Sequence, residues 1–226
     1  MTTYTKEEIE EILRTEKFPY QRVELPFGLS TPGQDRSQTR DLIFPKKLTG
    51  QTVLDVGCAL GYFSFEAEKL GAARILGIEL SDLRFRQANL LKKILGSNVE
   101  FQQRDILGDE LNEQFDVVLL LNVIHHLPEP MSALRKVASI CRNRLVLEFP
   151  TFADQRFRRS AGIKFSWLYE RLPLIGVSSM EPNTDQTFVF TKGAIRRVLL
   201  DHRALFKRVE FIASPMPGRL LAICEK

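Results

Sequence analysis

Three small residues at alternate positions, Gly57, Ala59 and Gly61, directly follow a short apolar run. Without bulky side chains, the backbone of such a turn passes close to a ligand and directs its amide groups toward it. Glu79 closes the next apolar run, and its carboxylate is suited to accept hydrogen bonds from the two hydroxyls of a ribose. A glycine turn followed by such an acid predicts a site for a cofactor that contains a nucleoside.

The residues around this turn distinguish a dinucleotide from S-adenosylmethionine. A dinucleotide fingerprint has a third glycine where the helix begins, which leaves room for a pyrophosphate, and here that position is Tyr62. Asp55, which precedes Gly57 by two residues, would repel a phosphate but suits the sulfonium and ammonium groups of S-adenosylmethionine. The predicted cofactor is therefore S-adenosylmethionine.

Three residues are candidates for catalysis. His125 follows the fourth predicted strand, and its ordinary pKa of about 6.5 suits a base or a group that orients the substrate. Glu148 ends the fifth strand, where it would act as a base, bind an ammonium group or pair with an arginine. Tyr20 is expected on the underside of an N-terminal arm. His125 and His126 come without a carboxylate cluster, so no metal is predicted.

The elements that must position these residues alternate between strands and helices. Strands are predicted over Thr52–Val56, Arg74–Glu79, Val99–Arg104, Phe115–Leu121, Arg144–Phe149, Phe206–Ala213 and Arg219–Cys224. Helices are predicted up to about Leu70, from Ser81 to about Leu95, from Pro130 and after Thr191. This order predicts an α/β, doubly wound, Rossmann-like sheet of seven strands, mostly parallel with an antiparallel last strand. Ligands of such sheets lie at the carboxyl ends of the strands.

Two segments depart from this alternation. Residues 1–48 are predicted to form an opening helix capped by Thr5, a Pro- and Gly-rich arm that lies over the domain like a lid, and a short helix around Ser37–Ile43. Residues 49–226 form the Rossmann-like domain, with an irregular insertion at about 150–190. The insertion contains Phe152, Arg156, Phe157, Arg158, Arg159, Lys164, Phe165, Trp167, Tyr169 and Arg171. It either covers the substrate, with its aromatic rings packed inward, or stacks on and neutralises RNA.

Length and composition exclude several classes of protein. The chain has 226 residues, of which 44% are hydrophobic and 27% charged, which is typical of one globular domain and not of a disordered or coiled-coil chain. A net charge of +4 allows an RNA partner but does not require one. The three cysteines lack C-x-x-C spacing, so neither disulfides nor zinc are predicted. No apolar stretch is long enough for a membrane span and no export signal is visible, so we expect a cytoplasmic protein; the oligomeric state is not indicated.

Four segments resemble, in the same order, the motifs of class I S-adenosylmethionine-dependent methyltransferases. Val53–Gly61 resembles motif I, with an alanine in place of one usual glycine, and Glu79 stands as the acid after the second strand. Gln103–Ile106 is similar to the motif whose Asp meets the adenine amino group, and Leu121–Leu127 resembles the motif after the fourth strand. The resemblance implies cofactor contacts from Asp55, Gly57, Cys58, Ala59, Gly61, Glu79, Leu80, Asp105, Ile106 and Asn122.

Within this superfamily the nearest likeness is to the tRNA wobble-uridine carboxymethyltransferase group. It extends from Asp35 to Pro45 and over Thr49–Leu95 and Leu145–Glu148. It implies that Arg36 and Arg40 of the arm bind the carboxylate of the cofactor. That group holds a carboxylated S-adenosylmethionine partly through a tyrosine where this chain has His125, so ordinary S-adenosylmethionine is the expected cofactor.

The resemblance implies a methyltransferase that acts on a small molecule, in which His125 or Glu148 accepts the proton of the nucleophile. Three alternatives remain open. One is a tRNA-modifying (carboxy)methyltransferase. Another is a non-methylating reaction of S-adenosylmethionine, such as an intramolecular cyclisation that releases methylthioadenosine. The third is a non-catalytic subunit that only binds the cofactor.

Overall fold

The structure is a computed structural model that describes residues 3–18, 20–160, 162, 169–170, 172–177, 188–201 and 205–226. The chain divides into two compact units, residues 1–109 and residues 110–226.

The first unit is built on three parallel strands in the order β3-β2-β1. They are β1 (Thr52–Val56), β2 (Arg74–Glu79) and β3 (Glu100–Gln103). The register pairs Val56 with Ile78 and Glu79 with Gln103, so the three strands end at one edge. This common edge is where parallel sheets bind ligands.

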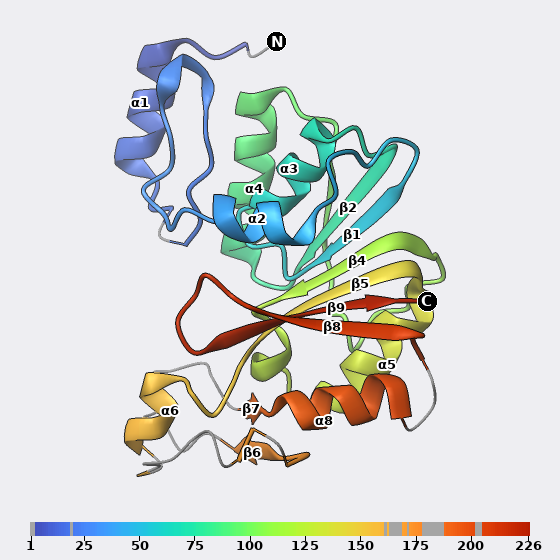
Figure 1. The fold of residues 1–226 in the computed structure, drawn as a ribbon. Helices are drawn as coiled ribbons and strands as arrows, with labels where there is room; N and C mark the ends of the chain where they lie inside the picture. The colour runs from blue at the N-terminus through green and yellow to red at the C-terminus, as the bar shows by residue number, and fades with distance from the viewer. Residues whose placement is uncertain are drawn as a thin grey trace. The chain divides into compact units, whose positions relative to one another are not determined.

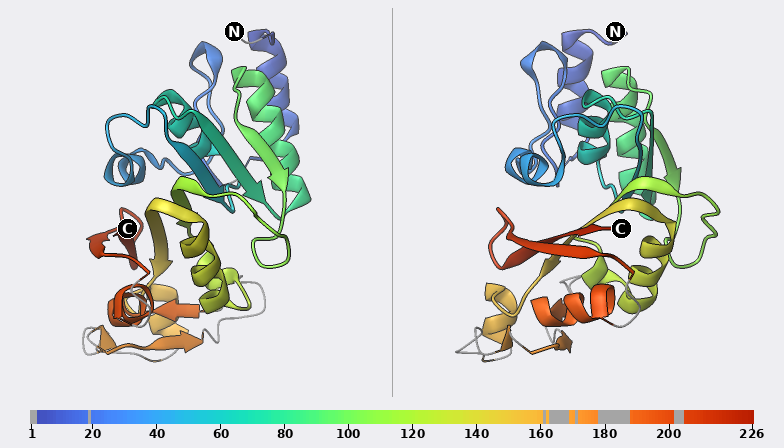
Figure 2. Two further views of the ribbon diagram at one scale, coloured as in Figure 1. Left: turned by 90° about the vertical axis from the view of Figure 1, so that its right-hand side faces the viewer. Right: turned by 45° about the vertical axis from the view of Figure 1, so that its right-hand side comes forward.

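The helices of the first unit include the four that the sequence predicts and one further 3-10 turn. They are α1 (Lys6–Thr15), the 3-10 turn η1 (Pro26–Gly28), α2 (Ser37–Ile43), α3 (Tyr62–Lys69) and α4 (Asp82–Leu95). Thr5 and Glu8 form the capping box of α1, because each side chain accepts the backbone N–H of the other. Helix α1 lies beside α4 in Figure 1 and Figure 2, and Gln87 of α4 donates to the Lys17 carbonyl at 2.7 Å.

The second unit is built on four strands in the order β4-β5-β9-β8. They are β4 (Phe115–Leu121), β5 (Cys141–Pro150), β8 (Arg208–Ala213) and β9 (Arg219–Glu225). Strands β4 and β5 are parallel, whereas β9 runs antiparallel to both β5 and β8. The unit also contains the 3-10 turn η2 (Ile124–His126), α5 (Pro130–Ile140), α6 (Gln155–Ser160), α8 (Lys192–Arg196) and the π-helical turn η3 (Arg197–Asp201).

The insertion at about 150–190 is more regular than its composition indicates. Besides α6, it contains β6 (Ile175–Val177) and β7 (Phe188–Phe190), which pair antiparallel and lie with α6 and α8 at one end of the second unit (Figure 2). Phe152, Phe157 and Val189 are buried in one cluster, so two of the predicted aromatic residues pack inward. Lys164, Phe165, Trp167, Arg171 and the side chain of Arg156 lie outside the described residues.

The predicted fold class is confirmed. The units contain the seven strands of a mostly parallel Rossmann-like methyltransferase sheet, and its antiparallel strand is β9, the last in the chain. Strand β5 begins at Cys141 rather than at the predicted Arg144, because α5 leads into it with no intervening loop. None of the helices among the described residues has the length and apolar character needed to cross a bilayer.

Candidate functional site

The glycine turn, residues Gly57–Gly61, connects β1 to α3 with a left-handed backbone at three of its five residues. The φ angles of Gly57, Ala59 and Gly61 are 66°, 53° and 84°. Glycine adopts this region freely, whereas a Cβ makes it unfavourable by roughly 1 kcal/mol. Ala59 therefore stands at a strained position where glycine is the ordinary residue.

Two glycines of this region make room for a phenylalanine ring. A Cβ on Gly61 would lie 2.5 Å from Cζ of Phe101, and a Cβ on Gly77 would lie 2.6 Å from Cδ1 of the same ring. Phe101 comes from β3 and was not predicted as part of the site. A glycine inside a predicted strand indicates close packing by a neighbour, and Gly77 is such a residue.

The backbone amide groups of the glycine turn have hydrogen-bond partners within the protein. Every backbone N–H from Gly57 to Tyr62 donates to an oxygen of the protein. The bonds are Gly57 and Cys58 to the Ile78 carbonyl (2.8 and 3.1 Å), Ala59 to Oε2 of Glu79 (2.9 Å), Leu60 and Tyr62 to Oε1 of Gln21 (3.0 and 3.2 Å), and Gly61 to the Cys58 carbonyl (2.9 Å). All six donors are therefore engaged within the protein, three of them by the side chains of Gln21 and Glu79.

Glu79 is held in one orientation at the end of β2. Its side chain is 6% exposed, and its two oxygens accept the N–H groups of Ala59 and Ser81, both at 2.9 Å. A carboxylate has about four acceptor sites, of which these bonds use two. The remaining capacity allows Glu79 to accept hydrogen bonds from a diol.

Asp55 is a buried acid on β1. Its side chain is 2% exposed and accepts a hydrogen bond from the Ser64 hydroxyl at 2.8 Å. Burial raises the pKa of Asp55 from 3.8 to about 7; the Ser64 hydrogen bond opposes this rise and the charge of Glu79 adds to it. At neutral pH the proton of Asp55 is therefore sensitive to a nearby charge.

The raised pKa of Asp55 predicts a pH-dependent stability. The folded protein keeps the proton of the Asp55 carboxyl in a pH range where the unfolded chain has lost it. The resulting contribution to the free energy of unfolding is fully present below about pH 4 and is lost as the pH rises to about 7. We therefore expect the free energy of unfolding of the wild type to fall, relative to Asp55→Asn, across this window and to run parallel to it above.

Urea titrations across that pH range measure this difference. Asp82→Asn, on the first turn of α4 with a side chain 62% exposed, is the matched control and leaves the profile of the wild type unchanged. If the profiles of wild type and Asp55→Asn are parallel over the whole range, Asp55 does not hold the proton.

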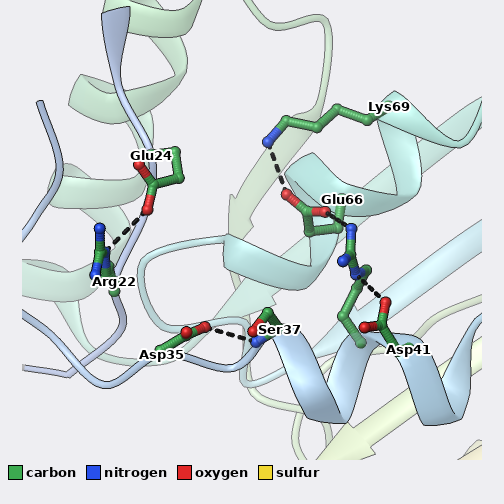
Figure 3. Close-up of polar contacts among 8 residues, drawn as sticks. Arg22, Glu24, Asp35, Ser37, Asp41, Glu66 and Lys69 are labelled. Atoms are coloured by element: carbon green, nitrogen blue, oxygen red, sulfur yellow. Dashed lines mark hydrogen bonds and ion pairs between the residues drawn. The ribbon is translucent and has the colours of Figure 1, made fainter. Parts of the chain in front are cut away.

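The arm residues lie in a network of charges. Arg40 of α2 contacts Glu66 at 3.0 Å and Asp41 at 2.8 Å, and Lys69 contacts the other oxygen of Glu66 at 2.7 Å (Figure 3). Arg36 is 4% exposed, and its guanidinium lies 5.4 Å from the centre of a phenylalanine ring on α3. The guanidinium groups of Arg36 and Arg40 thus both lie against side chains of α3.

The other candidates of the first unit differ in exposure. Tyr20 is 37% exposed, with the guanidinium of Arg84 5.4 Å from its ring centre. The Asp105 carboxylate accepts the Leu107 N–H at 2.8 Å, and the Asp105 N–H donates to Asp109, which closes the turn after β3. Further candidates are the buried Cys58 and Ile106 and the exposed Leu80.

In the second unit, Asn122 and Glu148 meet at the carboxyl ends of β4 and β5. Asn122 has a left-handed φ of 59°, its backbone N–H donates to the Glu148 carbonyl at 2.9 Å, and its side-chain amide donates to the Glu148 carboxylate. The other Glu148 oxygen accepts the Ser214 hydroxyl, and Arg219 donates to the Asn122 oxygen. We name Asn122, His125, Glu148, Ser214 and Arg219 the buried polar cluster. Two residues of this cluster, Ser214 and Arg219 from the β8–β9 hairpin, were not predicted from the sequence.

His125 is a neutral member of the buried polar cluster. It is 1% exposed, its Nε2 lies 3.3 Å from a guanidinium nitrogen of Arg219, and its ring centre is 4.0 Å from that of His126. Burial, with the charges of His126 and Arg219, lowers the pKa of His125 from 6.5 to about 2. So low a pKa makes a weak base, and these surroundings favour an orienting role for His125 over proton abstraction.

Comparison with protein families gives a match over residues 47–157, to a family described as a methyltransferase domain. This match includes β1 to β5, the glycine turn and Glu79. Residues 47–157 are a class I methyltransferase domain. S-adenosylmethionine is the cofactor of that superfamily.

The chain also matches enzymes of known name. A ubiquinone biosynthesis O-methyltransferase of Pseudomonas putida is 40% identical over 90 residues, which are 39% of this chain. An enzyme of the same name from Pseudomonas syringae pv. tomato shows the same identity over the same length. The chain spans only 38% of the length of these relatives.

Solved structures share the fold at low sequence identity. The N-terminal domain of EvdMO1, crystallised with S-adenosylhomocysteine and D-fucose, has a TM-score of 0.72 at 16% identity, over 98% of this chain and 97% of that one. Magnesium protoporphyrin IX methyltransferase of Synechocystis, with bound S-adenosylmethionine, has a TM-score of 0.55 at 20% identity, over 79% of this chain and 71% of that one. The likeness to the tRNA wobble-uridine group is not supported by these matches.

The chemistry of the residues present fits S-adenosylmethionine. Glu79 keeps acceptor capacity for ribose hydroxyls beside the glycine turn. Asp55 adds an acid whose protonation responds to positive charge. Within the residues that the structure describes, no group of three metal-binding side chains gathers.

Proposed function

We propose that this protein transfers a methyl group from S-adenosylmethionine to a small-molecule acceptor. The observation that carries the proposal is the buried Glu79 carboxylate, oriented at the end of β2 by the N–H groups of Ala59 and Ser81. Such a carboxylate binds the two hydroxyls of a ribose with little rearrangement.

In this proposal the first unit holds the cofactor. Glu79 accepts the ribose hydroxyls, and Asp105 accepts the adenine amino group. Arg36 and Arg40 attract the cofactor carboxylate, and Asp55 responds to its positive charge. The remaining contacts come from Gly57, Cys58, Ala59, Gly61, Leu80 and Ile106.

The bound cofactor supplies a methyl group on a sulfonium, which is already electrophilic, so the protein must mainly align the acceptor and exclude water. In the second unit, Glu148 is the residue that we assign to take the proton of the nucleophile. His125, which stays neutral, orients the acceptor by a hydrogen bond, and Asn122 fixes the Glu148 carboxylate.

A small acceptor is favoured by the names of the similar enzymes. One name refers to ubiquinone biosynthesis and another to magnesium protoporphyrin IX, and the third protein was crystallised in the presence of D-fucose. Because this chain spans 38% of the ubiquinone enzymes' length and is at most 20% identical to these two solved structures, the acceptor itself is not carried over.

Two buried rings speak against RNA as the acceptor. Phe152 and Phe157 are 6% and 4% exposed and pack edge to face, 5.2 Å apart, so neither ring offers a face for a base to stack on. Tyr169 stacks on Phe152 at 5.9 Å and is 38% exposed. These contacts favour the interpretation of the insertion as a cover over a small substrate.

The proposal is tested by product analysis. The purified protein is incubated with S-adenosylmethionine alone, with a metabolite extract and with bulk tRNA, and the nucleoside products are identified by mass spectrometry. We expect S-adenosylhomocysteine only with the extract. Its appearance only with tRNA would establish the RNA alternative instead. Methylthioadenosine from the cofactor alone would indicate cyclisation, and binding without any product would indicate a cofactor-binding subunit.

A further inference from the structure

We propose that Gln21 of the arm is a positioning residue for cofactor binding, because its side chain holds the glycine turn in shape. This inference rests on the proposed function, in which the turn contacts S-adenosylmethionine. Through this one contact the arm becomes part of the cofactor site. This role is additional to its predicted role as a lid.

The contact is a double hydrogen bond to one oxygen. Oε1 of Gln21 accepts the N–H of Leu60 at 3.0 Å and the N–H of Tyr62 at 3.2 Å. A carbonyl oxygen has two lone pairs, so one glutamine satisfies both donors. The Gln21 side chain reaches the turn from 39 and 41 residues away in the sequence and is 5% exposed.

The start of α3 needs a hydrogen-bond acceptor from elsewhere in the chain, because the residue directly before the helix cannot supply one. A helix begins with N–H groups that lack partners within the helix, and the residue before the helix usually accepts one of them through its side chain. Before α3 that residue is Gly61, which has no side chain and is required by its φ of 84° and by the ring of Phe101. Gln21 therefore replaces the missing cap from outside the helix.

The backbone of Gln21 is itself fixed by the arm. The Thr31 hydroxyl donates to the Gln21 carbonyl at 2.6 Å, and the N–H of Val23 donates to the same hydroxyl at 2.8 Å. A Cβ on Gly33 would lie 2.2 Å from the Gln21 carbonyl carbon, so only glycine allows the two arm segments to lie this close. With its backbone held in this way, Gln21 presents its side chain at a constant position.

Gln21 and Glu79 together hold adjacent residues of the turn. The N–H of Ala59 donates to Glu79, and the next N–H, of Leu60, donates to Gln21. A shift of the turn after loss of Gln21 would therefore disturb the carboxylate that we assign to the ribose. The predicted consequence is a weaker cofactor complex, beyond any loss of stability.

The test compares two buried glutamines that both contact the arm or its start. Gln21→Met removes the acceptor at the turn, and Gln21→Glu keeps an acceptor of the same reach. Gln87→Met is the matched control, because Gln87 is 4% exposed and donates to the Lys17 carbonyl at 2.7 Å, away from the turn. For each full-length variant, calorimetry gives the Kd for S-adenosylhomocysteine, and thermal unfolding gives the stability.

We expect Gln21→Met to bind S-adenosylhomocysteine about tenfold more weakly than the wild type, since two buried donors lose their acceptor. Gln21→Glu stays within about threefold of the wild type, because a carboxylate accepts the same two N–H groups. Gln87→Met binds like the wild type, although both methionine variants unfold at lower temperature.

The outcomes separate this inference from the proposed function. Equal Kd values for Gln21→Met and Gln87→Met would overturn the role of Gln21, as would a Gln21→Glu variant as weak as Gln21→Met. A wild-type protein that does not bind S-adenosylhomocysteine would overturn the proposed function, and the inference with it.

Hydrogen exchange on the wild type tests the same contact if Gln21→Met does not fold. We expect S-adenosylhomocysteine to slow exchange in peptides that cover residues 20–34 of the arm together with those that cover residues 57–65. Protection of the turn with no change in the arm peptides would refute the inference.

Discussion

Replacing Glu79 by alanine is expected to weaken binding of S-adenosylhomocysteine by at least about 100-fold. A hydrogen bond to a charged carboxylate contributes about 1.5–3 kcal/mol, and two ribose hydroxyls would lose such a partner. The Ala59 N–H would lose its acceptor as well, so the glycine turn is disturbed at the same time. Isothermal titration calorimetry on the purified protein measures the change in Kd.

Glu100→Ala is the matched control for Glu79→Ala. Glu100 lies on β3 with its side chain 46% exposed and forms an ion pair with Arg74 at 3.3 Å, so its removal gives the same change of net charge in the same unit. Its Kd is expected to equal that of the wild type. The prediction is wrong if Glu79→Ala and Glu100→Ala bind with Kd values within threefold of each other while both remain folded.

Replacing Glu148 by alanine is expected to lower the free energy of unfolding by about 3 kcal/mol, which corresponds to a fall of about 10 °C in Tm. Glu148 has no exposed surface, and its carboxylate accepts the Asn122 amide and the Ser214 hydroxyl. The alanine variant leaves both donors without this acceptor and leaves a cavity between Leu121 and Leu221, the neighbours of Glu148 in register on β4 and β9.

Two further variants separate stability from chemistry at this position. Glu210→Ala, on β8 with a side chain 52% exposed, is the control and changes Tm by little. Glu148→Gln keeps the size of the side chain, and the Ser214 hydroxyl can accept from its amide, so Tm stays near that of the wild type. If Glu148 accepts the proton of the nucleophile, Glu148→Gln nevertheless loses turnover. Wild-type turnover in Glu148→Gln would exclude this role.

Much of the fold could be predicted because its signals are local. The capping box at Thr5 predicts the start of α1, and Ser81 and Gly96 mark the ends of α4. The near-continuous apolar run Phe115–Leu121 predicts β4 with both ends correct. In each case the residues that determine the element lie inside it or next to it. The insertion gave no such signal, and its helix α6 and its strands β6 and β7 were not predicted.

The candidate site could be predicted only in part. Motif spacing along the chain predicts the glycine turn, Glu79 and Asp105 as site residues, because they end or directly follow predicted strands, and these assignments stay predictions. The surroundings of those residues depend on distant parts of the chain. From the sequence, His125 is expected to have the ordinary pKa of an imidazole. Burial beside Arg219, which is 94 residues away, makes it a poor base.

By itself, the sequence determined the α/β class, the order of strands and helices, and the nucleoside-type cofactor, since periodicity, caps and motif spacing are properties of neighbouring residues. Only the tertiary structure decided which groups satisfy the amides of the glycine turn, which ring fills the space beside its glycines, and which carboxyls are buried. These depend on Gln21, Phe101 and Ser64 reaching partners through space. Hydrogen bonding and desolvation act over a few ångströms, whatever the separation along the chain.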